Sequence, residues 1–349
     1  MKNYILKVEN EDFLASVSNL FRLMLDKKII DLILVPQETP QGKCVVQTLV
    51  GEASKVVTAN PFAPVLLGNS AKLVSDLTFR SENKKIGVVL RPCEVRALVE
   101  LVKLKQIDKK PLFIISVDCL GTYEVDDYKN NRQELRHACQ ACEYPRSKLY
   151  DMNIGFIGCD IKSEIMIKLG EQHEGIAKEL LLNQFDGEDK SEGAVKELKE
   201  KRIKFKESLF KTLKENIREI SGLLDILSTC KKCFNCQRAC PICYCKECIM
   251  CGSTFQYQMR DYLKSVNRAG VIKMPVDTLL FHLTRLNHMS TSCIACGQCT
   301  SACPSKIQIA DIFNMIGAKT QAIFNYTPGE NFEDELPQAT FREDELNEK

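Results

Sequence analysis

The sequence predicts two domains, an α/β (α+β) domain followed by a smaller, cysteine-rich domain. Two observations lead to this prediction: strand-like and helix-like segments alternate along residues 1–225, and twelve of the 18 cysteines lie within residues 229–303. A length of 349 residues and a hydrophobic content of 44% suffice for about two hydrophobic cores. We expect the domains to span residues 1–225 and 226–316, followed by an acidic, flexible tail over 317–349.

The first domain is expected to alternate between strands and helices. Apolar residues at helical spacing predict a helix over 12–26, and the buried strand 86–90 is expected to lead through Arg91-Pro92-Cys93 into another helix. The remaining expected elements are strands at 29–35, ended by Pro36, and at 112–117, a hairpin of 154–158 with 163–168, and a charged helix over 192–220 with a solvated face.

The charge of the chain is almost balanced, with 48 Lys and Arg against 46 Asp and Glu. This balance argues against bulk binding to nucleic acid or to an anionic membrane. No apolar run approaches the roughly 18 residues that span a bilayer, and charges interrupt the N-terminal segment where a signal peptide is apolar. We therefore expect a cytoplasmic protein without a membrane span, in which dense thiols indicate metal or redox chemistry rather than disulfides.

One cysteine motif occurs twice. Both runs match C-x2-C-x2-C-x3-C-P, the spacing of bacterial dicluster ferredoxins, in which the fourth cysteine binds the other cluster. The spacing therefore predicts two [4Fe-4S] clusters with crossed ligand sets: Cys230, Cys233, Cys236 and Cys303 for the first, and Cys293, Cys296, Cys299 and Cys240 for the second. A zinc ribbon uses paired C-x2-C knuckles and fits this pattern poorly. The 52 residues between the runs form an insertion, with helices expected over 255–288.

Eight further cysteines fall into two groups. Cys243, Cys245, Cys248 and Cys251 follow the first run with a spacing that is not that of a ferredoxin. An additional iron–sulfur cluster, a zinc site, or thiols packed between the two clusters remain open for them. Cys93 and Cys119 follow two predicted strands, and Cys139 with Cys142 forms a C-x2-C pair. Loops leaving neighbouring strands bring these four to one cluster, or they are ordinary buried thiols.

Several segments together resemble a known family. They are IGVVLRPCEVRAL at 86–98, Cys119, the Cys139/Cys142 pair, DMNIGFIG at 151–158 and CPICYCKEC at 240–248. In this order they are similar to the beta subunits of coenzyme F420-reducing hydrogenases and F420-dependent formate dehydrogenases. Arg91 stands where that family usually has threonine and Glu94 where it usually has glutamine, so the hydride carrier stays open between F420 and NAD(P).

The resemblance implies a flavin-binding first domain that holds FAD and its own [4Fe-4S] cluster at Cys93, Cys119, Cys139 and Cys142. It also implies hydride exchange with a soluble carrier and electron transfer to a catalytic partner such as a formate dehydrogenase, hydrogenase or heterodisulfide-reductase-like subunit. No G-x-G-x-x-G motif is present. The helix that opens after Arg91 and Pro92, or the turn at Asn60, is a candidate for the flavin pyrophosphate, with Arg96 and Arg146 as candidate phosphate partners.

Three functions follow from these patterns. The leading hypothesis is an iron–sulfur flavoprotein subunit that transfers electrons, with no catalytic side chain of its own. A flavin-free iron–sulfur adaptor is the alternative. A zinc-binding nucleic-acid module is the remote third hypothesis, and both the near-neutral charge and the tandem motifs argue against it.

Overall fold

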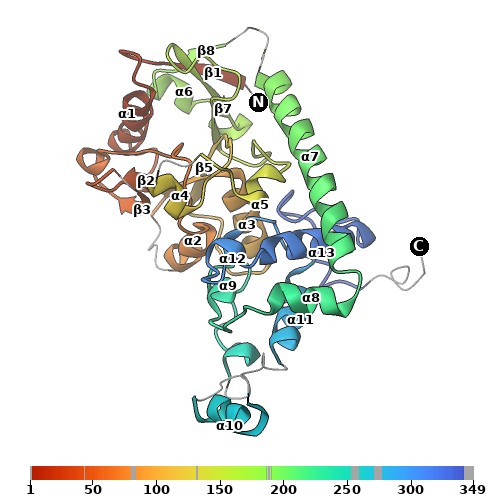
Figure 1. Cartoon of the computed structure of the whole chain (residues 1–349). Coiled ribbons are helices and arrows are strands. Elements are labelled where there is room, and N and C mark those ends of the chain that lie inside the picture. Colours follow the sequence, from red (N-terminus) through yellow and green to blue (C-terminus); the bar gives the residue numbers. More distant parts are fainter. Residues whose placement is uncertain are drawn as a thin grey trace.

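The computed structural model describes residues 2–42, 44–79, 84–130, 133–185, 187, 189, 191–252, 259–270 and 277–341. Figure 1 shows a sheet with helices on its faces in the upper part of the view and the cysteine-rich segments below it. The long helix α7 (Ser191–Asn216) runs along the side of the sheet and contacts helices of the lower part. None of the described helices is long and apolar enough to cross a bilayer.

The sheet is mixed and has eight strands. Their spatial order is β3 (Val45–Val50), β2 (Leu32–Glu38), β4 (Ile86–Leu90), β5 (Leu112–Val117), β6 (Met152–Gly155), β7 (Glu164–Leu169), β1 (Lys2–Lys7) and β8 (Asn183–Gln184). The four central strands from β2 to β6 are parallel, and the outer strands pair antiparallel. The first domain is thus an α/β unit, as expected.

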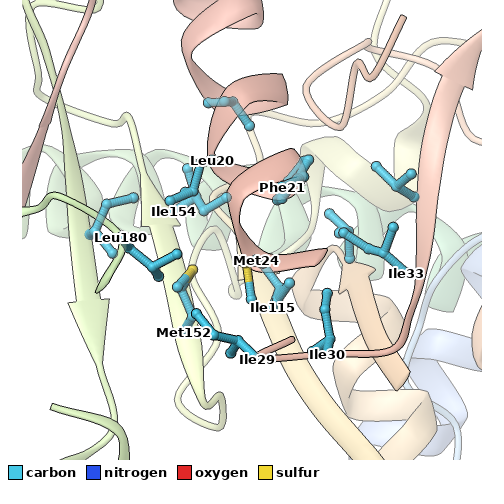
Figure 2. Close-up of a cluster of buried hydrophobic side chains, with 14 of the residues drawn as sticks. Leu20, Phe21, Met24, Ile29, Ile30, Ile33, Ile115, Met152, Ile154 and Leu180 are labelled. Carbon is cyan, nitrogen blue, oxygen red and sulfur yellow. The ribbon is translucent and has the colours of Figure 1, made fainter. Parts of the chain in front are cut away.

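Both faces of the central strands are covered, which explains why β4 and β5 consist of buried apolar residues. On one face α1 (Phe13–Asp26) packs Leu20, Phe21 and Met24 against strand residues such as Ile115 and Ile154 (Figure 2). On the other face α2 (Ala71–Thr78) and α3 (Pro92–Lys103) form a second core. That second core also contains Ile242 and Ile294 from the cysteine-rich segments, so the two parts share it.

Short helices make up most of the remaining structure. Those of the first part are α4 (Val125–Lys129), α5 (His137–Gln140) and α6 (Ile176–Glu179). Those of the second part are α8 (Ile220–Leu227), α9 (Asn235–Arg238), α10 (Met259–Ala269), α11 (Asp277–Met289), α12 (Gln298–Ser301) and α13 (Ile309–Ile323). The expected helical insertion corresponds to α10 and α11, while 253–258 and 271–276 lie outside the described residues.

Two predicted boundaries of secondary-structure elements are wrong. Strand β2 continues through Pro36 to Glu38, beyond Leu34, where its pairing with β4 ends. The Pro36 carbonyl oxygen accepts from the Asn60 amide, so the backbone of Pro36 faces away from β3 and its missing N–H costs no bond to that strand. The predicted helix 192–220 extends too far, because α7 ends at Asn216 and Ile220 is already the first residue of α8. The predicted domain boundary after residue 225 falls inside α8.

The predicted flexible tail is also corrected. Residues 317–323 belong to α13, and the chain beyond it packs on α3. Arg96 donates to the Pro328 carbonyl oxygen from Nε at 3.0 Å and Nη2 at 2.8 Å. Glu100 accepts from the Tyr326 hydroxyl at 2.7 Å and the Gly329 amide at 2.8 Å. Arg96 and Glu100, both buried on α3, thus find hydrogen-bond partners in the tail, and Glu100 is also ion-paired with Lys103 at 2.7 Å. Residues 342–349 lie outside the described part.

Candidate functional site

The two ferredoxin-type runs enclose two small pockets. One pocket is lined by Cys230, Cys233, Cys236 and Cys303, the first set. The other is lined by Cys240, Cys293, Cys296 and Cys299, the second set. In each set one cysteine comes from the opposite run, which is the crossed arrangement expected from the spacing. No three His, Cys, Asp or Glu side chains among the described residues lie close enough to hold a single metal ion.

The two runs also share an unusual backbone. Lys232 and Ala295, each just before the second cysteine of its run, have φ of 51° and 56°. Phe234 and Gly297, each just after it, have φ of 60° and 77°. Three of these four residues are not glycine, and left-handed backbone is unfavourable for them. The same unfavourable backbone conformation at matching positions turns each run around its pocket. Strained backbone of this kind is typical of functional sites.

The buried thiols that line the two pockets are suited to binding a cationic group. Burial raises the pKa of Cys293 to about 11 and that of Cys296 to about 12. Burial likewise raises the pKa of Cys230 and Cys236. A buried thiol loses its proton readily only where positive charge stabilises the thiolate. Iron would supply that charge if it were bound in the two pockets, so the donor set fits the [4Fe-4S] clusters that its spacing predicts.

Arg285 of α11 lies between the two sets. It is 3% exposed, and it donates from Nη1 to the Cys236 sulfur and from Nη2 to the Cys236 carbonyl oxygen, both at 3.1 Å. The thiols of Cys240 and Cys299, which belong to the second set, also influence its pKa. Arg285 therefore contacts one set and faces the other. Nothing in the spacing of a single arginine marks Arg285 out in the sequence.

His282 is buried beside the first set. Its Nε2 lies 3.4 Å from the Cys230 sulfur. Burial, with a smaller effect of Arg285, lowers its pKa to about 4, so the ring is neutral at pH 7. A neutral ring has one N–H to offer the sulfur, and His282 is thus a hydrogen-bonding neighbour of the first set.

The four N-terminal cysteines form a third set at the carboxyl edge of the sheet. Cys93 lies in the first turn of α3, after β4, and Cys119 follows β5. The thiols of Cys119 and Cys142 raise the pKa of Cys93 beyond the effect of burial, and those of Cys139 and Cys119 do the same for Cys142. Electrostatic coupling of this kind requires the four thiols to lie near one another. The convergence follows from parallel strands that end at the same edge.

Arg136 joins the third set to the second. It is 6% exposed, and its Nη2 lies 3.6 Å from the Cys139 sulfur, while its Nη1 donates to the Ser301 hydroxyl at 3.1 Å on α12. Cys296 of the second set is one of the thiols whose charge raises the pKa of Cys93. Gly297 approaches Ala138 so closely that an added Cβ would lie 2.5 Å from the Cβ of Ala138. The second and third sets are therefore packed directly against each other.

The Cys243–Cys251 group is divided between different surroundings. The Cys243 sulfur lies 3.5 Å from the Met289 sulfur, and a hydrogen bond couples it to Cys240. Gln237 donates to the Cys251 sulfur at 3.5 Å. Cys248 packs on the core around the first set, and Cys245 is exposed. Of the three interpretations left open by the sequence, this placement favours thiols packed between and beside the two ferredoxin sets.

Two of the predicted phosphate partners are used by the protein itself. Arg146 forms a double hydrogen bond with the buried carboxylate of Asp118, at 2.8 and 2.7 Å. Arg96 binds the Pro328 carbonyl, as described, and also the Ile294 carbonyl at 3.1 Å. A buried carboxylate and buried carbonyls require these donors, and so neither arginine is free for a phosphate. The prediction that Arg96 and Arg146 bind a phosphate therefore does not fit their surroundings.

The other predicted flavin residues lie nearby but are also hydrogen-bonded. Asn60 donates to Glu38 Oε1 at 2.6 Å. Arg91 donates from Nη2 to the carbonyl oxygens of Pro61 and Ala63. Pro92 is the first residue of α3, as expected for a helix start. Glu94 receives hydrogen bonds from the Arg91 and Ser70 amides, both at 2.9 Å, and so ties the starts of α2 and α3 together.

A cleft of about 480 Å³ opens beside these helix starts. Its polar lining includes Arg91, Glu94, Gln47 and Ser70, and Arg238 closes it from the cysteine-rich part. Its remaining walls are largely apolar and include Val45, Val65, Leu66, Leu67 and Leu73. Gln47 Oε1 and Ser70 Oγ are buried and have no hydrogen-bond partner within the described residues. Apolar walls with a few unpaired polar atoms are typical of small-molecule sites of this volume.

The cysteines of the third set should differ in their reactivity with pH when the chain is free of iron. Burial opposes ionisation of Cys139, but Arg136 and Thr122 outweigh it and lower its pKa, whereas burial raises the pKa of Cys142. The thiolate is the reactive form, so alkylation of Cys139 should rise at a lower pH than alkylation of Cys142. Peptide mass spectrometry after timed iodoacetamide treatment checks this order. Equal pH profiles for the two cysteines would contradict the environment described for Arg136.

Comparison with known proteins identifies similar chains. No model of a known protein family matches. The F420-dependent formate dehydrogenase subunit beta of Methanocaldococcus jannaschii is 25% identical over 369 residues, covering 90% of this chain and 91% of the relative. The F420-dependent formate dehydrogenase 1 subunit beta of Methanococcus maripaludis is 28% identical over 382 residues, covering 93% of this chain and 92% of the relative.

A solved chain of the xenon-derivatised F420-reducing [NiFe] hydrogenase complex from Methanosarcina barkeri matches 61% of this chain and 93% of its own length, with a TM-score of 0.48 and 13% identity. The two curated relatives confirm the resemblance expected from the sequence.

Proposed function

We propose that this chain, a relative of F420-dependent formate dehydrogenase beta subunits along 90% of its length, is an iron–sulfur flavoprotein subunit of an oxidoreductase complex. In this proposal it holds three [4Fe-4S] clusters and FAD, and it exchanges hydride with F420 or NAD(P). A flavin connects two-electron hydride chemistry to one-electron carriers, and the clusters supply the one-electron steps. A separate catalytic subunit, such as a formate dehydrogenase, hydrogenase or heterodisulfide-reductase-like protein, receives or delivers the electrons.

The observation that carries the proposal is the succession of three cysteine sets. Cys236 of the first set and Cys240 of the second face the same guanidinium, that of Arg285. Cys296 of the second set lies near Cys93 of the third. Three adjacent sites of this donor type support a path for single electrons from the sheet domain through the cysteine-rich part.

The two ends of this path differ in exposure. Cys233 of the first set is exposed, whereas Cys93, at the other end, lies in the first turn of a buried helix of the sheet domain. Between them, Ile242 and Ile294 are buried around the second set and exclude water from it. This asymmetry supports contact of the first set with the catalytic partner and of the third set with the flavin.

The cleft beside Arg91 is the site that we propose for the flavin. Asn69, which lines the cleft, donates to the Cys93 carbonyl oxygen at 3.4 Å, so the cleft adjoins the third set. Gln47 Oε1 and Ser70 Oγ are free to bind polar edges of a ring, and Val65 and Leu66 offer apolar walls. Arg91 contributes a positive charge to the lining of the same cleft, beside the Glu94 carboxylate that caps the starts of α2 and α3.

A flavin-free adaptor remains a second candidate because of one specific observation. The guanidinium groups of Arg91, Arg96 and Arg146 all donate to groups of the protein itself. A pyrophosphate would have to be bound mainly by backbone amides, or by Arg91 after it released the loop carbonyls. An adaptor would use the three clusters and leave the cleft without a nucleotide.

Anaerobic purification followed by flavin analysis and reduction distinguishes the two candidates. The proposal expects about one FAD per chain and bleaching of the cluster absorbance on addition of F420H2 or NADH. Gln47→Leu, which removes an unpaired cleft atom, should lower the flavin content and leave the iron content unchanged. Clusters without flavin, reducible only by dithionite or a protein donor, would establish the adaptor. A colourless chain that holds zinc would contradict both.

A further inference from the structure

Two buried arginines occupy the two junctions between the cysteine sets. Arg285 lies between the first and second sets and Arg136 between the second and third. They are 3% and 6% exposed, and within the described residues neither is within ion-pair distance of a carboxylate. The Nε atoms of both also have no hydrogen-bond partner there. A buried cation is costly unless negative charge lies near it. For Arg136 part of that charge comes from Glu124, which Ser301 links to it.

The cysteines supply negative charge at both junctions. Burial opposes the charge of Arg285, but the thiolates of Cys236, Cys240 and Cys299 outweigh this effect and raise its pKa. Burial also opposes the charge of Arg136, and Cys139, followed by Glu124 and Cys93, outweighs this effect and raises its pKa. Both guanidiniums thus stay cationic and direct N–H groups toward cysteine sulfur, at 3.1 Å for Arg285 and 3.6 Å for Arg136.

Aromatic rings and a serine hold these side chains in place. The Arg285 guanidinium lies 5.0 Å from the ring centroid of Phe313 and 5.7 Å from that of Phe281. Arg136 is held by the Ser301 hydroxyl, which itself donates to Glu124 at 3.0 Å. The positive charges are therefore fixed at the junctions and do not swing into solvent.

We propose that Arg285 and Arg136 set the reduction potentials of the clusters on both sides of each junction, by stabilising the additional negative charge of the reduced cluster. The inference rests on the proposed iron–sulfur function. The step concerned adds one electron to a cluster; no proton moves and no bond to either arginine forms or breaks. Hydrogen bonds and charge near cluster sulfurs are established determinants of such potentials. Because each arginine faces two sets, one substitution should shift two clusters.

Redox titration followed by electron paramagnetic resonance tests the inference on the full, cluster-loaded chain. Dithionite supplies the electrons. Arg136→Gln should lower the equilibrium constant for reduction of the second and third clusters about tenfold, or about 59 mV for a one-electron couple, and leave the first cluster unchanged. Arg285→Gln should shift the first and second clusters instead. The lysine variants, which keep the charge, should restore most of each shift.

Arg218→Gln is the matched control. Arg218 lies between α7 and α8 and is exposed, so water screens its charge and its loss should change the potentials less than about threefold. Unchanged potentials in Arg136→Gln and Arg285→Gln with full iron content would overturn the inference and leave the proposed function intact. If a glutamine variant loses iron, its lysine variant decides: a loaded lysine variant supports a need for charge, and iron loss in both variants assigns the arginine a purely structural role. Absence of clusters in the unmodified chain would refute the proposed function itself.

Discussion

Replacing Cys303 with serine is expected to remove the first cluster, although Cys303 belongs to the second run. Cys303 lines the pocket of Cys230, Cys233 and Cys236. A serine in its place removes one of four thiolates, and the iron content should fall by about four atoms per chain. The matching change Cys240→Ser should remove the second cluster, because Cys240 lines the pocket of Cys293, Cys296 and Cys299.

Double variants identify which cluster is lost. If the sets are crossed, Cys230→Ser combined with Cys303→Ser disables one site only and should lose about four irons, no more than either single change. Cys293→Ser combined with Cys303→Ser disables two sites and should lose about eight. Sets confined to their own runs predict the opposite pattern for these two doubles. Cys44→Ser is the control, since Cys44 belongs to none of the three sets.

Gly297→Ala is expected to weaken the contact between the second and third sets. Gly297 has φ of 77°, and an added Cβ would lie 2.5 Å from the Ala138 Cβ beside Cys139. The left-handed backbone should lower the free energy of unfolding of the alanine variant by about 1–2 kcal/mol, and the overlap with α5 should lower it by roughly 1–3 kcal/mol more. Denaturant unfolding should show this loss of stability, and electron transfer between the second and third clusters should slow as the two sets move apart.

Gly42→Ala separates the two costs of that substitution. Gly42 also has a left-handed backbone, with φ of 63°, but nothing lies within 4 Å of its added Cβ. It should therefore cost only the backbone term and leave electron transfer unchanged. Equal losses of stability for the two variants, with equal electron-transfer rates, would show that Gly297 does not make the close approach described here.

The parts of the fold that the sequence predicts are those with strong local signals. The run 86–90 is apolar throughout because β4 is buried on both faces, and α1 shows its buried stripe at helical spacing. The crossed cysteine sets follow from spacing because a cubane cluster constrains its ligands within a short loop. Each of these patterns is complete within a short stretch of chain.

The parts that the sequence does not predict depend on distant partners. The acidic composition after residue 316 indicates a flexible tail, yet Tyr326 and Gly329 bind Glu100, more than 220 residues away in the chain. The charged face expected for α7 also has an exception, because Arg202 is buried and donates to the Cys142 and Cys119 carbonyl oxygens, both at 3.4 Å. Composition describes the average environment of a segment and does not identify the one residue whose partner lies elsewhere.

The roles of the buried arginines have the same origin. Arg136, Arg202 and Arg285 come from separate helices or turns and meet the cysteine sets only after folding. Arg96 and Arg146 look equally free in the sequence, but buried carbonyls and Asp118 take up their hydrogen bonds. Since the arginine guanidinium donates hydrogen bonds to carboxylates, carbonyls, sulfur and phosphate alike, the tertiary structure determines which of these it binds.

The most direct test of three cluster sites in one chain is the count of iron and acid-labile sulfide per chain. The measurement uses anaerobically purified protein, together with the variant Cys93→Ser in the third set. The structure predicts about twelve irons and twelve sulfides in the unmodified chain and about eight of each in the variant. About eight irons in both proteins would contradict a cluster at Cys93, Cys119, Cys139 and Cys142, and with it the path from the sheet domain to the ferredoxin sets.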